Sequence, residues 1–208
     1  MSRNTGPKMR KVRSHGEEFA MAADRSLANK YIRSHRKQPP GVHGSNQLFR
    51  KHSNYSLQLR EKQKAKILYY LTEKQMRGYY KMAAKHAGST SDNLLRILES
   101  RLDNIIYRAG FANSHPAARQ LISHRQFSWN GQRVSIPSIL VSPGDKIAFV
   151  GKSNKLKEGL TVTATENQPA SWLEVDANKV TIVVKNLPEK VEAAMPLNEQ
   201  LIVEFYSR

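Results

Sequence analysis

The sequence predicts an α+β fold, because a long helical stretch is followed by a compact unit of two helices and an antiparallel hairpin. The compact unit spans Ser91 to Val150, and the preceding segment Tyr55–His86 is helical by period and propensity, with room for two helices. Before them, Met1–Lys37 is polar and basic without a clear period. We expect a basic N-terminal arm over residues 1–45, a helical domain over 46–90 and a mixed domain over 91–186.

The compact unit begins with one predicted helix, because apolar residues recur at gaps of three and four. These residues are Leu94, Leu95, Leu98, Leu102, Ile105, Ile106 and Ala109. Ser91 can cap the start of this helix, and Gly110 can adopt the left-handed conformation that ends it. Ser114 can then cap a second, shorter helix with Pro116 in its first turn, where a missing N–H costs nothing.

Strands follow the two helices. Asn130-Gly131 between Phe127–Trp129 and Gln132–Val134 is a strong hairpin signal, because both turn residues can adopt positive φ. A further turn precedes the predicted strand Lys146–Val150. Two later strands are expected at Thr161–Thr165 and Val180–Val184, where β-branched residues alternate or run together.

The composition is strongly basic, with 34 Lys and Arg against 17 Asp and Glu in 208 residues, a formal net charge of +17. Residues 1–90 carry a net charge of +15, residues 91–160 of +5 and residues 161–208 of −3. This balance indicates a polyanionic partner, RNA or DNA first and an anionic membrane second. The polyanion should meet the first half and the central unit, with the acidic tail facing elsewhere.

Other classes of protein find little support in the sequence. The sequence contains no run of 18 apolar residues, so it predicts no membrane span. The N-terminus lacks the apolar stretch of a secretory signal. The chain has no cysteine, so we expect no disulfide and no thiolate metal site, which is compatible with the cytosol. His35, His43 and His52 match no metal-binding spacing, and no metal or other cofactor is predicted.

Two patterns of cations mark the helical segment. Arg60, Lys62, Lys64 and Lys66 alternate, whereas Lys74, Arg77, Lys81 and Lys85 recur at three and four and share one helix face. The acids available to balance them are Glu61 and Glu73. We therefore favour RNA binding over a solvated face, because unbalanced repulsion is offset by a bound anion.

The compact unit adds its own basic and amide residues, and the packing of a short helix on a hairpin should gather them on one side. They are Arg101, Arg108, Arg119, Gln120, His124, Arg125 and Arg133. For any one of them a solvated helix face is an equally good explanation. Asp103, beside Arg101, is explained by a structural ion pair.

Several motifs resemble the S4 family of small-subunit ribosomal proteins in order and spacing. They are GPKMRKVR at Gly6–Arg13, QPPGVHG at Gln38–Gly44, YSLQLREKQKAKILY at Tyr55–Tyr69, ESRLDNIIYRAGF, AARQLISH, NGQRVSIPS and VSPGDKI in the compact unit, and LNEQLIVEFYS at Leu197–Ser207. The compact unit alone resembles a module that also occurs in tRNA synthetases and pseudouridine synthases. The flanking motifs extend the likeness over nearly the whole chain, and the motif that begins at Gly6 argues against a transit peptide.

The resemblance implies a structural RNA-binding protein of the bacterial-type small ribosomal subunit, in the cytoplasm. It implies binding to the five-way junction in the 5′ domain of the ribosomal RNA, nucleation of assembly and an interface with ribosomal protein five that affects decoding fidelity. It also implies proximity to the mRNA channel, and in some bacteria translational autorepression. We expect no homo-oligomer and no membrane partner. The family further implies that the segment 187–208 returns to complete the helical domain, although LIVEF near the C-terminus resembles a short strand.

The sequence departs from the family at a few positions. Met9 and Val12 stand where many relatives carry two cysteines of a zinc knot, so we predict a variant without zinc. Arg125 follows the second helix where relatives often have Gly, at a cost of about 1 kcal/mol if the backbone there is left-handed. His115 stands near a position where relatives often have an Arg that contacts phosphate.

We considered three alternatives to a ribosomal role. An RNA-modifying enzyme would need a catalytic domain, but the chain shows no Gly-rich phosphate loop, no HExxH and no nucleophile elbow, so we predict no enzyme. A stand-alone RNA-binding module would not explain the helices of Tyr55–His86. A DNA-binding winged helix-turn-helix can be imitated by two helices before a hairpin, and a binding test distinguishes it.

The predicted RNA-binding residues are mainly cations of the arm, the helical domain and the compact unit. They are Arg3, Lys8, Arg10, Lys11, Arg13, Arg50, Lys51, Tyr55, Arg60, Lys62, Lys64, Lys66, Lys74, Arg77, Lys81, Lys85, Arg101, His115, Arg119, Gln120, His124, Arg125 and Arg133.

Overall fold

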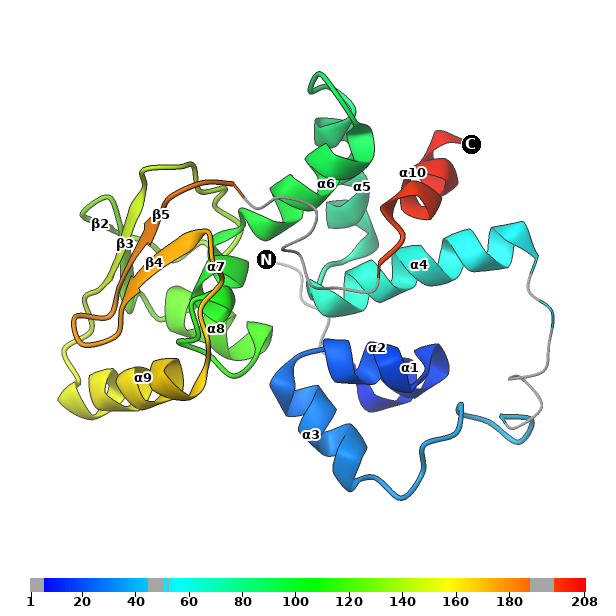
Figure 1. Cartoon of the computed structure of the whole chain (residues 1–208), viewed down its shortest axis with the longest axis horizontal. Helices are drawn as coiled ribbons and strands as arrows, with labels where there is room; N and C mark the ends of the chain where they lie inside the picture. The colour runs from blue at the N-terminus through cyan, green and yellow to red at the C-terminus, as the bar shows by residue number, and fades with distance from the viewer. Residues whose placement is uncertain (1–5, 45–50, 52, 188–196) are drawn as a thin grey trace. The chain divides into compact units, whose positions relative to one another are not determined.

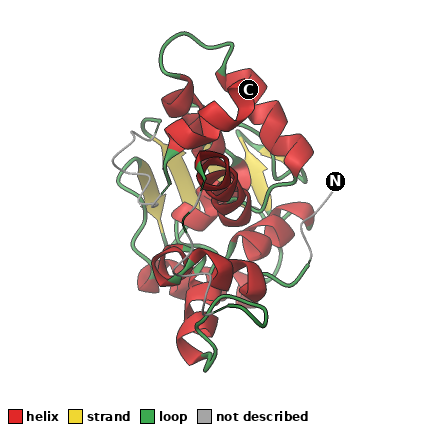
Figure 2. Cartoon of the chain, turned by 90° about the vertical axis from the view of Figure 1, so that its right-hand side faces the viewer, coloured by secondary structure: helices red, strands yellow, loops and turns green. Residues whose placement is uncertain are grey.

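The computed structural model describes residues 6–44, 51, 53–187 and 197–208. It divides into two compact units, the first formed by Met1–Leu95 with Ala194–Arg208 and the second by Arg96–Ala193 (Figure 1). The strands of the described residues all belong to one sheet in the second unit, whereas the first unit is helical where it is described (Figure 2). The predicted α+β class is therefore confirmed.

The first unit opens with three short helices, α1 (Met9–His15), α2 (Glu17–Ala22) and α3 (Arg25–Arg33). They enclose a small core of buried side chains: Val12, Phe19, Ala20, Leu27, Ala28 and Tyr31. Here the structure differs from the expected arm. Each helix is only 6 to 9 residues long, so the few apolar residues spread over three helices show no single period in the sequence.

The two helices expected in Tyr55–His86 are confirmed as α4 (Asn54–Leu68) and α5 (Glu73–Ala83). The cap of α4 is Ser53, whose Oγ accepts the backbone N–H of Ser56 at 3.3 Å.

A C-terminal helix, α10 (Glu199–Ser207), packs against α4 and α5, which confirms that the C-terminal segment completes the helical unit. The strand-like interpretation of LIVEF is wrong. Asn198 caps the helix by accepting the N–H of Leu201 at 3.3 Å, and Ile202 is buried. Burial of one apolar stripe against α4 therefore outweighs the β propensity of the run.

The predicted helix over Ser91–Ala109 is two helices, α6 (Thr90–Glu99) and α7 (Leu102–Arg108). Between them Arg101 is extended, with φ −68° and ψ 138°. The break exists because the backbone pairs with a distant segment: the N–H of Leu102 donates to Ile139 O, and the N–H of Val141 donates to Ser100 O, both at 2.9 Å. One continuous helix would lose these bonds.

The local signals around the next helix, α8 (His115–Ser123), are confirmed. Gly110 has φ +85° just after α7, and the Ser114 Oγ accepts the N–H of Ala117 at 3.4 Å with Pro116 in the first turn. A Cβ on Gly110 would lie 2.9 Å from the Asn167 Cβ, so glycine there serves both the turn and the packing.

Five antiparallel strands form the sheet in the order β2-β1-β3-β5-β4. Their bounds are β1 (Phe127–Trp129), β2 (Gln132–Arg133), β3 (Lys146–Phe149), β4 (Leu173–Asp176) and β5 (Thr181–Val184). The Asn130-Gly131 turn joins β1 and β2 with φ of +48° and +84°, as predicted. The main core of this unit joins α7 and α8 to the sheet through Ile105, Ile122, Phe127, Ile147 and Ile182.

The strand predicted at Thr161–Thr165 is wrong, because the segment belongs to the helix α9 (Asn154–Glu166). Leu160 and Ala164, four residues apart, are buried in the core of the second unit. The threonine hydroxyls bond back along the helix, Thr161 to Lys157 O at 3.1 Å and Thr163 to Gly159 O at 2.8 Å. Tertiary burial thus outweighs the β propensity of threonine and valine.

Candidate nucleic-acid interface

An ion triad lies inside the second unit. The Asp103 carboxylate accepts two bonds from Arg101, Nε to Oδ1 at 3.0 Å and Nη2 to Oδ2 at 2.7 Å. The Arg119 Nε lies 3.0 Å from the same Oδ2. The Arg101 side chain is 0% exposed and that of Asp103 1%. The expected structural ion pair is therefore present and buried.

A second polar network lies beside the turn between α6 and α7. The Glu99 carboxylate is buried and accepts two bonds from Arg108, at 3.1 and 2.8 Å. The amide of Asn104 donates to the Glu99 carboxylate, and its Oδ1 lies 2.9 Å from the His115 Nε2. Because Oδ1 is an acceptor, this contact assigns the proton of the His115 ring to Nε2.

These networks change the interpretation of the predicted module surface. Arg101 and His115 are buried, and Arg119 is largely covered, so none of the three presents a free cation to solvent in this structure. His115 also stacks on Tyr107, with ring centroids 4.2 Å apart. We therefore assign Arg101 and His115 to the interior of the unit, because a phosphate cannot reach a group without exposed surface.

The exposed part of the predicted module surface is formed by Gln120, His124, Arg125 and Arg133. Arg125 has φ +56°, so the left-handed backbone considered for this position is present, and Arg133 Nη2 donates to Val150 O at 2.9 Å. Gln120 and His124 line a groove of about 490 Å³, whose other wall is α9 with Lys155. The groove is thus lined by polar and cationic side chains together with apolar ones.

The alternating cations of α4 are mostly engaged with acids. Lys62 and Lys66 share Glu73, at 3.2 and 2.7 Å, and Lys64 lies 2.6 Å from Glu61. Lys62 is buried and its Nζ lies 4.1 Å from the centroid of the Phe205 ring of α10. Lys62 and Lys66 therefore join α5 to α4, and Lys62 also contacts α10, whereas Lys64 pairs within α4. The two acids of this segment, Glu61 and Glu73, thus balance all three lysines.

The cations of α5 behave differently. Lys74, Arg77, Lys81 and, just after the helix, Lys85 are all exposed. None of them lies within 4 Å of a carboxylate in the part of the chain that the structure describes. This row, which we call the α5 stripe, is an unbalanced positive surface among the described residues of the first unit.

The remaining predicted residues of the first unit vary in exposure. Arg10 and Lys11 are exposed on α1. Lys51, before α4, and Tyr55, in its first turn, are also exposed, Tyr55 to 51%. The Lys8 Nζ lies over the Tyr70 ring, 3.3 Å from its centroid. Arg3 and Arg50 lie outside the described residues.

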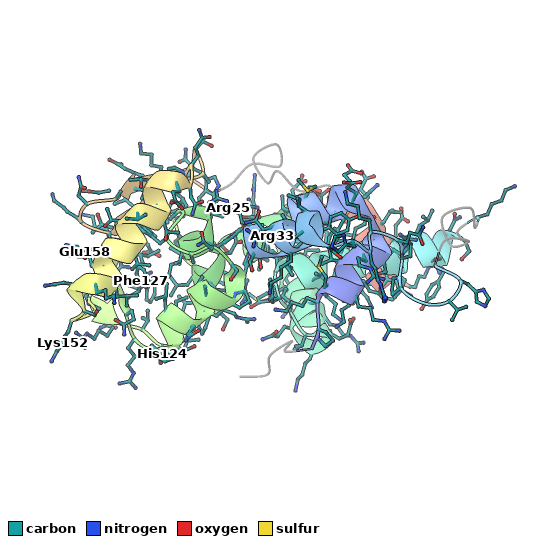
Figure 3. All side chains as sticks on the ribbon, turned by 90° about the horizontal axis from the view of Figure 1, so that it is seen from below. Arg25, Arg33, His124, Phe127, Lys152 and Glu158 are labelled. Atoms are coloured by element: carbon teal, nitrogen blue, oxygen red, sulfur yellow. The ribbon has the colours of Figure 1, made fainter. Side chains whose placement is uncertain are left out.

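Further exposed cations were not predicted from the sequence. Arg25, Lys30 and Arg33 project from α3, and Lys152 and Lys155 lie at the start of α9 (Figure 3 labels Arg25, Arg33 and Lys152). The signal for α3 was present in Leu27 and Tyr31, four residues apart and both buried. It was weak, because the remaining inner positions are mainly alanine.

Two other kinds of site find no support in the described ranges. No group of three or more potential metal-ligating side chains occurs there. No described helix has the length and apolar character needed to cross a bilayer.

Two helices packed on a small antiparallel sheet, with exposed cations and amides beside the second helix, define an RNA-binding protein with an S4-type module. Residues 100–147 match the family model of the S4 domain, and residues 3–99 match that of the ribosomal protein S4/S9 N-terminal domain.

Relatives match the chain over its full length. It is 43% identical over 212 residues to small ribosomal subunit protein uS4 of Stenotrophomonas maltophilia, and 45% identical over 211 residues to the protein of that name from Acetivibrio thermocellus, with all of each chain covered. The protein of that name from Thermodesulfovibrio yellowstonii is 44% identical over 211 residues, again with full coverage. The chain therefore belongs to the ribosomal protein S4 family. This family consists of structural proteins of the small ribosomal subunit, part of the cytoplasmic ribosome in bacteria, and not of enzymes.

Proposed function

We propose that this chain is a structural constituent of the small ribosomal subunit that binds the five-way junction in the 5′ domain of the ribosomal RNA. The observation that carries the proposal is the α5 stripe, whose four exposed cations have no carboxylate partner within the described residues. Each such cation can displace a condensed counterion from a phosphate.

The proposed mechanism is positioning. Basic helices neutralise phosphates where RNA helices converge, and so hold the junction in its folded geometry. Recognition is mostly by shape, because the major groove of A-form RNA is closed to side chains. In the second unit, His124, Arg125 and Gln120 supply the contacts, since they are exposed beside α8.

Arg101 and Arg119 have a different role in this proposal. They fix the break between α6 and α7 and the position of α8 through Asp103, and so act on RNA binding indirectly. The buried ion pair of Arg101 with Asp103 is structural. Substitution of either residue would change the fold of the unit as well as its affinity for RNA.

The finer functions rest on the family resemblance. We propose that the chain nucleates subunit assembly, contacts ribosomal protein five with an effect on decoding fidelity, and lies near the mRNA channel. Translational autorepression belongs to the same proposal. One chain acts per subunit, without forming a homo-oligomer.

The test is the affinity of the full chain for a transcript of the 5′ domain, beside an unrelated structured RNA of equal length, over a salt series. We expect a preference for the 5′-domain transcript that persists as salt rises. Equal binding of both RNAs, lost together with rising salt, would contradict junction recognition and leave only non-specific charge attraction.

A further inference from the structure

The turn between β1 and β2 contains a chemically reactive pair of residues. Asn130 is followed by Gly131, both residues are exposed, and the sequence contains no other Asn-Gly pair. An asparagine before glycine is prone to spontaneous deamidation, because glycine has no Cβ to hinder attack by its backbone nitrogen on the preceding carboxamide. The positive φ of both residues makes the same pair suitable for the hairpin turn. The geometry of the turn thus depends on a reactive pair.

The carboxamide of Asn130 is bonded at both of its polar atoms. Nδ2 donates to Asp145 Oδ1 at 2.8 Å, and Oδ1 accepts the backbone N–H of Lys146 at 2.9 Å. Because a carboxylate only accepts and a backbone N–H only donates, these two contacts define one orientation of the amide. The backbone N–H of Asn130 also donates to Lys146 O at 2.8 Å. The side chain is therefore tethered to the start of β3.

Asp145, the acceptor of this tether, is itself fixed in place. Its Oδ2 accepts the Nε1–H of Trp129 and the backbone N–H of Ser142, each at 2.9 Å. Burial alone would raise the pKa of Asp145, but hydrogen bonds from Asn130, Ser142 and Trp129 outweigh it and lower the pKa. The group is therefore a carboxylate at neutral pH.

Deamidation requires the tether to break. In this reaction the backbone nitrogen of Gly131 forms a bond to Cγ of Asn130, the Cγ–Nδ2 bond breaks, and ammonia leaves with the proton of the glycine nitrogen. Water then opens the resulting succinimide ring to aspartate or isoaspartate. The carboxamide must turn towards the following peptide, and this movement breaks its bonds to Asp145 and Lys146. Access does not limit the reaction, because a Cβ on Gly131 would meet no atom within 4 Å.

We propose that Asn130 is a deamidation site that Asp145 protects in the folded chain, so that the modification accumulates in chains whose second unit has remained unfolded. In the unfolded chain the two tethers are absent, and the Asn130-Gly131 pair is free to react. In the folded chain Asp145 acts as a positioning residue, because it holds the reacting carboxamide away from the glycine nitrogen.

Neither product fits the turn as asparagine does. Aspartate replaces the Nδ2 donor by a carboxylate oxygen beside Asp145, so two like charges meet where a hydrogen bond was. Isoaspartate adds a methylene to the backbone of the two-residue turn that joins the paired residues Trp129 and Gln132. A modified chain therefore forms the second unit less stably than an unmodified one.

The direct test compares deamidation of the full chain in its folded state and in urea, at the same mildly alkaline pH and temperature. Trypsin cleaves after Arg125 and Arg133 and releases a peptide whose single asparagine is Asn130, so mass spectrometry reads the loss of its amide directly. We expect deamidation in the folded chain to be slower by at least roughly tenfold, because its hydrogen bonds must break first. Equal rates in the two states would overturn the proposal.

Two variants separate the tether from global stability. Asp145→Ala removes the acceptor of Nδ2 and should raise the rate in the folded chain roughly tenfold, with no change in urea. Ile182→Val removes a methyl group from the core of the same unit without touching the carboxamide, and should leave the rate near that of the wild type. Circular dichroism verifies that both variants are folded, and the wild-type comparison does not depend on them. An equal increase in both variants would contradict the role of Asp145.

The consequence of the modification is tested with Asn130→Asp. We expect this variant to unfold at a lower denaturant concentration than the wild type, whereas Asn178→Asp, in the exposed turn before β5, should not. Combining Asn130→Asp with Asp145→Asn exchanges the carboxylate and the amide, and should recover most of the loss. Equal midpoints of Asn130→Asp and Asn178→Asp, or no recovery in the exchanged pair, would show that the charge of the product does not disturb the turn.

Discussion

Arg101 and Asp103 form a bidentate ion pair that is shielded from solvent, with Nε and Nη2 of the arginine 3.0 and 2.7 Å from the two carboxylate oxygens. The pair sits where the backbone leaves α6 and enters α7. Removal of either partner of this buried pair would destabilise the fold, because the other partner would remain as a buried, uncompensated charge.

Removal of the acid at this site should destabilise the second unit strongly. We expect Asp103→Ala to lower the free energy of unfolding by roughly 3–5 kcal/mol, since it leaves Arg101 and Arg119 without their carboxylate. Denaturant unfolding of the full chain measures the loss. Glu174→Ala, which breaks the exposed pair with Lys185, should cost no more than about 1 kcal/mol. Similar losses in the two variants would argue against a structural role of Asp103.

Charge reversal of the α5 stripe should weaken RNA binding without unfolding the protein. In Lys74→Glu with Lys81→Glu, we expect a lower affinity for the 5′-domain transcript and a shallower salt dependence, by roughly one unit of slope for each phosphate that is no longer neutralised. The matched control reverses Lys179 and Lys185, which are exposed but paired with acids in the second unit. An equal effect of both double variants would mean that net charge, and not the α5 stripe, determines affinity.

Substitution of Arg125 should separate stability from RNA binding. Arg125→Gly removes the strain of a side chain at φ +56° and should raise the free energy of unfolding by about 1 kcal/mol, yet it removes an exposed cation. Arg125→Ala removes the cation but keeps the Cβ, so it should weaken RNA binding without the gain in stability. If Arg125→Gly binds RNA as the wild type does, Arg125 makes no phosphate contact.

Acid should loosen the attachment of α10. Burial alone would raise the pKa of Glu73, but hydrogen bonds from Lys66, Tyr206 and Lys62 outweigh it and lower the pKa to about 2. A carboxylate with a depressed pKa stabilises the fold fully above its unfolded pKa, about 4.3, and loses this contribution as pH falls toward 2.

We expect the stability of the first unit to decrease through this pH window, and Glu73→Gln to remove that part of the dependence. Denaturant unfolding between pH 5 and about pH 2.5 measures it. Glu18→Gln, at an exposed position on α2, serves as the control and should keep the wild-type profile. A profile of Glu73→Gln that coincides with the wild type would show that Glu73 does not carry the effect.

Features fixed by neighbouring residues were predictable from the sequence. The Ser114 cap, the left-handed Gly110 and the Asn130-Gly131 turn depend on a few adjacent residues and the φ that each can adopt. The family motifs then indicated the order of the units, because they combine several such local signals.

Features fixed by distant partners were not predictable. The break at Arg101 needs the backbone of Ile139 and Val141, about forty residues later in the chain. The threonine-rich part of α9 is helical because Leu160 and Ala164 are buried, which the local β propensity does not indicate. In the candidate interface, the pattern located cations correctly but could not tell Lys62, paired with Glu73, from Lys74, which has no carboxylate partner in the described structure.

The contact between α10 and α4 also constrains the order in which the protein forms during translation. The Gln58 Nε2 donates to the Glu204 carboxylate at 2.7 Å across 146 residues of sequence, and the whole second unit lies between them. The nascent chain must therefore expose the apolar side of α4 for roughly ten seconds while the later residues are made. During that interval the second unit can already fold, so the packing of α10 on α4 is completed after it.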